Sequence, residues 1–337
     1  MKHRDNKTIL VTGGAGYIGS TLVRMLLQKG YRVVCVDKLK FGGASLVDIW
    51  GDPNFVLHNI DITDSKALDD VFKQYDIYAV VHLAAIVGDP ACKLEPELAT
   101  RTNLEASIHL LENAIRFQVR NFVFASTCSN YGKMKDPNGF VDESSPLRPI
   151  SLYAELKVEF ETILLKQKTI NSFCPTVLRF ATVYGISPRM RFDLTVNEFT
   201  KELALGRELS VFGEQFRRPY CHVRDISQAI MRVVSFPDNR VSYEIFNVGD
   251  TSQNYTKKMV VNEIMKEIPD GQVKYVPRDE DPRDYCVCFE KIKNVLGYDI
   301  TRTVPQGIRE ILTSLRMGII ENPDSQIYYN TPAVGAI

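Results

Sequence analysis

The chain has 337 residues, 45% hydrophobic and 24% charged, which is the balance of an ordinary globular protein. Its 41 lysines and arginines equal its 41 aspartates and glutamates, so no net charge favours nucleic acid as a partner. No apolar stretch approaches the roughly 20 residues that span a bilayer, and the charged N-terminus lacks a signal-peptide core, so we expect a cytoplasmic protein without a membrane partner.

Short β-branched runs alternate with amphipathic segments through the first half of the chain. The expected strands are Thr8–Thr12, Arg32–Asp37, Phe55–Asn59, Ala79–His82, Asn121–Ser126 and Thr176–Phe180. The expected helices are Tyr17–Gln28, Ser65–Gln74, Glu95–Phe117 and Tyr153–Lys168. Such alternation predicts an α/β fold with a doubly wound parallel sheet of the Rossmann type and helices on both faces.

The alternation loosens beyond Gly185, where arginines become frequent. We interpret residues 1–185 as a Rossmann domain to which later segments near 219–250 return. Residues 186–330 are then mainly a smaller, partly interwoven C-terminal substrate domain.

The first expected strand runs directly into a glycine-rich loop, Thr12-Gly13-Gly14-Ala15-Gly16-Tyr17-Ile18-Gly19. Its tight turn lets backbone N–H groups approach a pyrophosphate at the positive N-terminus of the following helix. Asp37 ends the next strand, 18 residues past Gly19. A carboxylate there accepts hydrogen bonds from an adenosine ribose and repels a 2′-phosphate. The sequence therefore predicts NAD rather than NADP as the cofactor, a preference that the adjacent Lys38 softens.

Tyr153 and Lys157 are four residues apart and therefore lie on one face of an expected helix. A tyrosine with a pKa of about 10 is a poor base, but a nearby ammonium stabilises the phenolate and lowers that pKa. The tyrosinate can then take the proton of a substrate hydroxyl while hydride leaves for nicotinamide. In isolation, the same pair is more often a helix face that carries one extended lysine.

Several motifs follow one another in a fixed order along the chain. They are the glycine loop, Asp61-Ile62, His82-Leu83-Ala84-Ala85, Asn103, Ser126-Thr127 through Tyr131-Gly132, and Tyr153 with Lys157. Together they resemble the extended short-chain dehydrogenase/reductase family, in its nucleotide-sugar epimerase/dehydratase branch. The resemblance extends from Thr8 to about Gly318.

The resemblance implies roles for individual residues. Those expected to contact NAD are Gly13, Gly16, Tyr17, Ile18, Gly19, Asp37, Asp61, Ile62, Leu83, Ala84, Ala85, Tyr153 and Lys157. The expected catalytic residues are Thr127, Tyr153 and Lys157, with Tyr153 as the acid/base and Thr127 bonded to the reacting oxygen. Those expected to contact a nucleoside-diphosphate sugar are Thr127, Ser129, Thr182, Asn197, Arg218 and Arg283.

Some of these substrate contacts have a chemical rationale and one departs from the family pattern. The guanidinium groups of Arg218 and Arg283 suit phosphate oxygens. Thr182 stands where many epimerases have asparagine, so this position departs from the family's phosphate contact. The family also implies a homodimer through the helices expected at 95–117 and 153–168.

Cys128 follows the expected catalytic threonine and bears on the reaction. In the 4,6-dehydratases of the family, Asp-Glu occupies the places of Cys128 and Ser129, so 4,6-dehydration is not expected. The 3,5-epimerases of GDP-sugars use a cysteine one place later than Cys128, so we interpret Cys128 as a packing residue. The seven cysteines show no Cys-x-x-Cys or Cys/His ligand spacing, which predicts reduced thiols and no metal site.

Two reactions confined to the sugar C4 remain. The favoured one is 4-epimerisation through a 4-keto intermediate. The alternative is a C4-dehydrogenase that releases the 4-keto sugar, because residues 86–93 resemble a subgroup near bacterial GDP-heptose 4-dehydrogenases. Arg218 and Arg283 disfavour a hydroxysteroid-type dehydrogenase, and the retained Tyr153 and Lys157 disfavour a non-catalytic dinucleotide sensor. The nucleotide base and the sugar are not encoded in any of these motifs.

Overall fold

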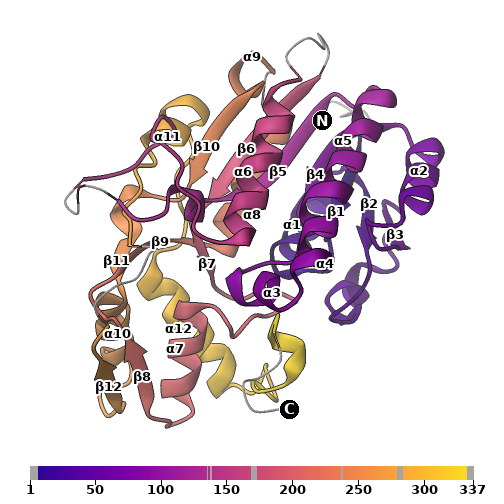
Figure 1. Ribbon diagram of the computed structural model, residues 1–337. Coiled ribbons are helices and arrows are strands. Elements are labelled where there is room, and N and C mark those ends of the chain that lie inside the picture. The colour runs from indigo at the N-terminus through magenta and orange to yellow at the C-terminus, as the bar shows by residue number, and fades with distance from the viewer. Residues whose placement is uncertain are drawn as a thin grey trace.

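The computed structural model describes residues 7–134, 136, 139–167, 173–236, 238–278 and 284–331. Figure 1 shows a larger lobe around a central sheet and a smaller lobe below it, close to the C-terminus. Within these residues no helix has the length and apolar character needed to cross a membrane.

The larger lobe is built on a seven-stranded parallel sheet in the order β10-β6-β5-β4-β1-β2-β3. Its strands are β1 (Thr8–Thr12), β2 (Arg32–Asp37), β3 (Phe55–Asn59), β4 (Ile77–His82), β5 (Asn121–Thr127), β6 (Cys174–Phe180) and β10 (Glu244–Val248). The strand order reverses between β1 and β4, the point at which open α/β sheets bind ligands beyond the carboxyl ends of their strands. The predicted doubly wound α/β fold is thus confirmed.

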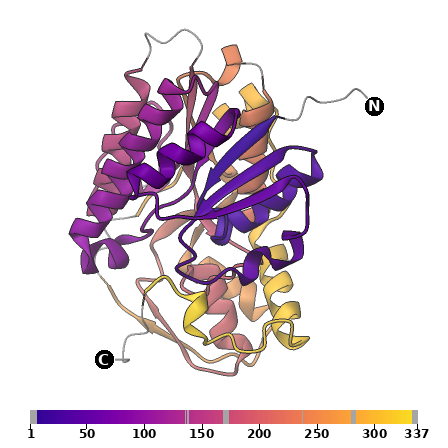
Figure 2. The same ribbon diagram turned by 90° about the vertical axis from the view of Figure 1, so that its right-hand side faces the viewer.

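Helices cover both faces of this sheet, as Figure 2 shows from the side. One face packs against α1 (Tyr17–Gln28), α8 (Val223–Ser235) and α11 (Glu290–Leu296), and the other against α2 (Ser65–Gln74), α5 (Ala106–Arg116) and α6 (Leu152–Leu165). In β1, Ile9 and Val11 belong to the first core and Leu10 to the second. A strand buried on both sides explains the continuous apolar runs in the sequence.

The segment expected as one helix over Glu95–Phe117 is divided. It comprises α4 (Pro96–Thr100), a π-helical turn over Arg101–Glu105, and α5. The turn brings the Asn103 amide to the backbone of Ile86, where Oδ1 accepts from the N–H at 2.8 Å and Nδ2 donates to the carbonyl at 2.9 Å. A further helix, α3 (Asp89–Leu94), begins after Gly88 with proline in its first turn. The expected helix Tyr153–Lys168 corresponds to α6, and Lys168 lies outside the described residues.

The smaller lobe packs helices against short strands. Its helices are α7 (Thr195–Ala204), α10 (Lys257–Met265) and α12 (Val304–Arg316). Its sheets contain β11 (Asn254–Thr256), β9 (Arg217–His222) and β7 (Thr182–Tyr184) in one, and β12 (Val273–Val276) with β8 (Leu209–Phe212) in the other.

The two lobes share the chain in an interleaved way. β9 belongs to the smaller lobe. Of the elements that follow it, α8 and the short α9 (Asp238–Val241) pack on the large sheet, and β10 is the edge strand of that sheet. The division at residue 185 into a Rossmann domain and a substrate domain stays a prediction, because the chain passes between the lobes more than once.

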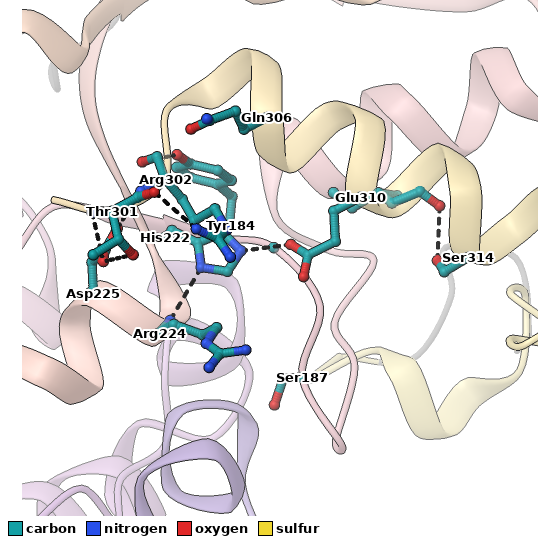
Figure 3. Close-up of polar contacts among 12 residues, drawn as sticks. Tyr184, Ser187, His222, Arg224, Asp225, Thr301, Arg302, Gln306, Glu310 and Ser314 are labelled. Carbon is teal, nitrogen blue, oxygen red and sulfur yellow. Dashed lines mark hydrogen bonds and ion pairs between the residues drawn. The ribbon is translucent and has the colours of Figure 1, made fainter. Parts of the chain in front are cut away.

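A hydrogen-bonded junction connects β9, α8 and α12 (Figure 3). The buried ring of His222 bonds Glu310 Oε2 through Nε2 at 2.7 Å and accepts from the Arg224 backbone N–H through Nδ1 at 3.2 Å. Since Nδ1 accepts, Nε2 carries the proton that is donated to Glu310. One turn further, the Asp225 carboxylate accepts from Thr301 N and Oγ1 at 2.9 and 2.7 Å. These bonds fix the start of α8 against the smaller lobe.

His82 at the end of β4 is a buried polar group inside the large sheet. Its ring nitrogens bond Thr12 Oγ1 at 2.7 Å and Ser107 Oγ at 2.8 Å. Burial, together with the nearby Lys157 ammonium, lowers the pKa of His82 from 6.5 to about 3. The folded protein therefore holds this imidazole neutral.

We expect acid to destabilise the fold through His82. As the pH falls from 6.5 towards 3, the unfolded chain binds a proton that the folded protein excludes, so stability falls by up to about 1.4 kcal/mol per pH unit. His82→Gln removes this contribution and should show a shallower loss between pH 6.5 and 4, measured by urea unfolding at several pH values. Identical pH slopes for the variant and the wild type would contradict the assignment.

Candidate active site

The turn between β1 and α1 lies against the backbone that follows β4. Gly13 has φ of +75°, and a Cβ there would lie 2.8 Å from the Ala84 backbone nitrogen. At Gly19 a Cβ would overlap the Gly13 carbonyl oxygen. No side chain caps the N-terminus of α1 at Gly16, so the N–H groups of its first turn are available to an anion. This geometry fits the pyrophosphate of NAD.

Asp37 at the end of β2 is held by its own loop. Its Oδ2 accepts from the Ala15 N–H at 2.9 Å and its Oδ1 from the Leu39 N–H at 2.8 Å. Burial raises the pKa of Asp37, and these two bonds oppose that shift. Lys38 forms an ion pair with Asp61 at 3.0 Å. Lys38 is thus engaged with Asp61, and its effect on the exclusion of a 2′-phosphate by Asp37 stays a prediction.

Other residues expected at the cofactor cluster around the same turn. The backbone N–H groups of Leu83 and Ala84 donate to the Thr12 carbonyl and hydroxyl at 3.1 and 3.3 Å. Ile62 is buried beside β2 in the core. Ala85 directly follows Ala84, and Ile18 directly follows Tyr17 in the first turn of α1. The structure thus brings the β1, β2 and β4 ends together at the predicted site.

Two residues predicted to bind ligands use their side chains to connect the lobes. Tyr17 Oη donates to the Gly185 carbonyl at 2.6 Å and accepts from Asn197 Nδ2 at 3.1 Å. Asn197 Oδ1 accepts from the Gly185 N–H at 2.9 Å, and Nδ2 also donates to the Arg191 carbonyl at 2.8 Å. The amide of Asn197 is therefore satisfied within the protein. Its substrate contact stays a prediction, and Tyr17 is left with its backbone N–H for a phosphate.

The predicted catalytic residues lie on β5 and on α6, which packs against it. Lys157 on α6 donates from Nζ to the Ala125 carbonyl at 2.8 Å, and Nζ lies 5.8 Å from the Tyr153 ring centroid. Thr127 ends β5, and its Oγ1 accepts from the Ser129 N–H at 3.1 Å. The docking of α6 on β5 therefore places a phenol, an ammonium and a hydroxyl at one end of the sheet.

Burial controls the proton affinities at this site. It raises the pKa of Tyr153 and lowers the pKa of Lys157 to about 8. The sequence predicts that Lys157 lowers the pKa of Tyr153, whereas in the structure burial raises that pKa. The physical reason is that Lys157 donates to the Ala125 carbonyl, while loss of water around the phenol opposes its ionisation. Tyr153 is held as a proton donor in this state.

The sequence did not single out several groups that lie near Tyr153. Cys92, Arg191, Asp89 and Tyr285 all come within electrostatic range of its hydroxyl. Asp89 Oδ1 accepts from Ser151 Oγ at 2.7 Å, and Ser151 is the N-cap of the helix that carries Tyr153. The signal for this arrangement was a serine two residues before the tyrosine, a typical N-cap.

The residues expected to contact the substrate have different surroundings in the structure. Ser129 Oγ lies 3.4 Å from Tyr285 Oη, and the Arg218 guanidinium lies 5.3 Å from the Tyr285 ring centroid. Tyr285 therefore connects two predicted substrate residues. Thr182 pairs with Tyr220 between β7 and β9. Arg283 lies outside the described residues, and its role stays a prediction.

Cys128 points away from the reacting groups. Its Sγ is buried in the core and donates to the Arg179 carbonyl at 3.3 Å. Burial raises the pKa of this thiol well above its usual value, so it stays protonated. Across the described part of the chain, no cluster of three or more His, Cys, Asp and Glu side chains could hold a metal ion.

Comparisons with known proteins identify the family of the chain. Residues 9–249 match the sequence profile of the NAD dependent epimerase/dehydratase family. The UDP-glucose 4-epimerase of Schizosaccharomyces pombe is 30% identical over 295 residues, which are 80% of this chain and 83% of that protein.

Two solved structures are similar over almost the whole chain. The UDP-glucose 4-epimerase of Thermotoga maritima with UDP-glucose has a TM-score of 0.82 and 29% identity, covering 93% of this chain and 99% of that one. The dTDP-glucose 4,6-dehydratase of Bacillus anthracis in complex with NAD has a TM-score of 0.81 and 26% identity, covering 93% and 98%. The similar proteins therefore include both epimerases and dehydratases.

Substitutions at adjacent positions should separate the hydroxyl from the thiol. Thr127→Val removes the hydroxyl at the end of β5 and should lose much of the turnover, whereas Cys128→Ala should keep most of it because the thiol faces the core. Steady-state kinetics on a converted sugar nucleotide, with thermal unfolding as a check on folding, measure both effects. A folded but inactive Cys128→Ala enzyme would assign the thiol a chemical role.

Proposed function

The chain belongs to the NAD-dependent epimerase/dehydratase family of enzymes, whose cofactor is NAD, and on that premise we propose that it is a nucleotide-sugar 4-epimerase. One observation carries the choice within the family. Thr127 ends β5 and Tyr153 and Lys157 lie on the helix packed against it, while positions 128 and 129 carry a thiol and a hydroxyl instead of carboxylates. Oxidation and reduction at C4 need only the first three groups, whereas 4,6-dehydration needs an additional acid and base.

Each of the three residues has a distinct task in this reaction. Tyr153 exchanges a proton with the C4 oxygen, and the Thr127 hydroxyl hydrogen-bonds the same oxygen. Lys157 supplies positive charge beside the phenol from a position fixed by the Ala125 carbonyl. When bound, NAD supplies a reversible hydride acceptor at C4. An epimerase must return that hydride, so tight retention by Asp37 and the glycine loop is part of the proposed function.

The proposed substrate is a nucleoside-diphosphate sugar. Arg218 and Arg283 are suited to the diphosphate by their paired N–H donors. Ser129, close to Tyr285, is suited to a sugar hydroxyl. Similarity of the chain to UDP-glucose 4-epimerases supports the assignment. The second candidate is a C4-dehydrogenase, which residues 86–93 favour and which differs in releasing the 4-keto sugar.

The reaction is tested with a panel of UDP-, GDP-, dTDP- and CDP-sugars, analysed by product NMR in H₂O and D₂O. We expect a C4 epimer without net NADH formation and without carbon-bound deuterium, because only hydride moves at C4. Tyr153→Phe is the control and should lower kcat by roughly 10²–10⁴-fold. Stoichiometric NADH with a 4-keto product would establish the dehydrogenase instead, and deuterium at C5 would exclude both.

We also propose a cytoplasmic homodimer that associates through the outer faces of α5 and α6. In the single chain Leu111, Phe160 and Leu164 are buried against the sheet, whereas Ile108 and Ile163 are only half-buried and remain available to a partner. Light scattering should give twice the mass of one chain at micromolar concentration. The double variant Ile108→Glu with Ile163→Glu should have the mass of a single chain. A monomeric wild type would reject this interface.

A further inference from the structure

Arg189 is a buried cation that the proposed reaction does not use. It follows β7 on the segment that passes from the smaller lobe to α1, and its side chain is only 6% exposed. Its Nε and Nη2 atoms have no hydrogen-bond partner among the described residues. Burial and the neighbouring Arg191 lower the pKa of Arg189 to about 10, so the group is still charged at neutral pH. A buried charge without a partner is costly, which points to a ligand.

The identity of the two unpartnered atoms restricts the chemical class of the ligand. Nε and Nη2 form one edge of the guanidinium, and their N–H bonds run side by side. That edge binds two acceptor oxygens of one planar or tetrahedral anion, such as a carboxylate or a phosphate. The next arginine behaves differently, because Arg191 places Nε and Nη2 on the Asp193 carboxylate at 2.9 and 2.7 Å. The same donor edge is thus neutralised within the protein at Arg191 and left open at Arg189.

The position of Arg189 in the fold indicates which anion it binds. Its backbone N–H donates to Ser20 Oγ at 3.4 Å, and Ser187 Oγ donates to the Tyr17 carbonyl at 2.6 Å. Both contacts attach the segment to the first turns of α1. The guanidinium carbon lies 4.0 Å from the Phe41 ring centroid, on the loop after β2. Arg189 therefore lies between the uncapped N-terminus of α1 and the loop that carries Asp37, and it is within electrostatic range of that carboxylate.

We propose that the Nε–Nη2 edge of Arg189 binds the adenosine-side phosphate of the NAD pyrophosphate. The dinucleotide is then held from two sides, by backbone N–H groups of α1 in the larger lobe and by a guanidinium from the smaller lobe. Cofactor binding would neutralise the buried charge and fasten the two lobes to each other at this point. This assignment concerns NAD binding only and is independent of the reaction at C4.

Isothermal titration with NAD, NADP, ADP, adenosine, UDP and GDP tests the proposal on protein freed of bound cofactor. Arg189→Gln should weaken NAD and ADP by roughly 10- to 100-fold, the effect of losing a charged hydrogen-bonded pair, and leave adenosine unchanged. Arg189→Lys should recover part of the loss, since it keeps the charge without the paired donors. Arg224→Gln removes one exposed positive charge at the lobe junction and should bind NAD like the wild type.

Other outcomes would overturn the assignment. An equal loss for adenosine and ADP would place the guanidinium on the ribose, and a loss confined to NADP would place it on a 2′-phosphate. Weaker binding of UDP or GDP with unchanged NAD would place it at the substrate. Unchanged affinity for all of them would make Arg189 a structural residue. If Arg189→Gln does not fold, wild-type affinity for ADP in Arg189→Lys would equally reject the phosphate contact.

Discussion

The close approach of Gly13 to the backbone at Ala84 sets the geometry on which the site depends. A side chain at residue 13 would separate the β1–α1 turn from the end of β4, and these are the two strands between which the sheet order reverses. The same contact fixes where α1 begins. From that helix Tyr17 reaches the Gly185 carbonyl, and Ser20 reaches the segment that carries Ser187. A contact between two backbones thus positions the cofactor turn and the attachment of the second lobe together.

Burial is the second constraint, because it shifts the pKa values of the groups at the site. His82, Lys157 and Tyr153 lie close together near the ends of β4 and β5. Burial lowers the pKa of His82 and Lys157 and raises that of Tyr153, which in each case favours the uncharged form. A neutral imidazole beside Lys157 adds no further positive charge to the site. Burial around Tyr153 therefore resists the charge separation that an ionised tyrosine requires.

The sequence predicted those features that depend on neighbouring residues in the chain. The strands β1, β2 and β3, the glycine turn and the helix carrying Tyr153 and Lys157 all follow from local patterns, and the structure has them. The pairing of β10 with β6 was not predictable in this way, because it joins residues about 70 apart through packing alone. Motif position also could not reveal what a side chain contacts. Asn197 lies where the family pattern expects it, yet its amide is bonded to Tyr17 and Gly185. The contacts of Tyr285 and Arg189 could not be predicted either, because they are made with distant segments of the chain.

The interleaving of the lobes has a consequence for how the protein is made. β10 is synthesised well after β6, yet it supplies the partner that covers the outer edge of β6. Until residue 248 has left the ribosome, a nascent chain with the other six strands in place would present that edge unpaired, together with apolar residues on both faces. Exposed strand edges are where chains associate incorrectly. The nascent chain thus passes through a vulnerable interval during translation, and a chain shortened before β10 would retain the whole glycine loop while lacking the strand that completes its sheet.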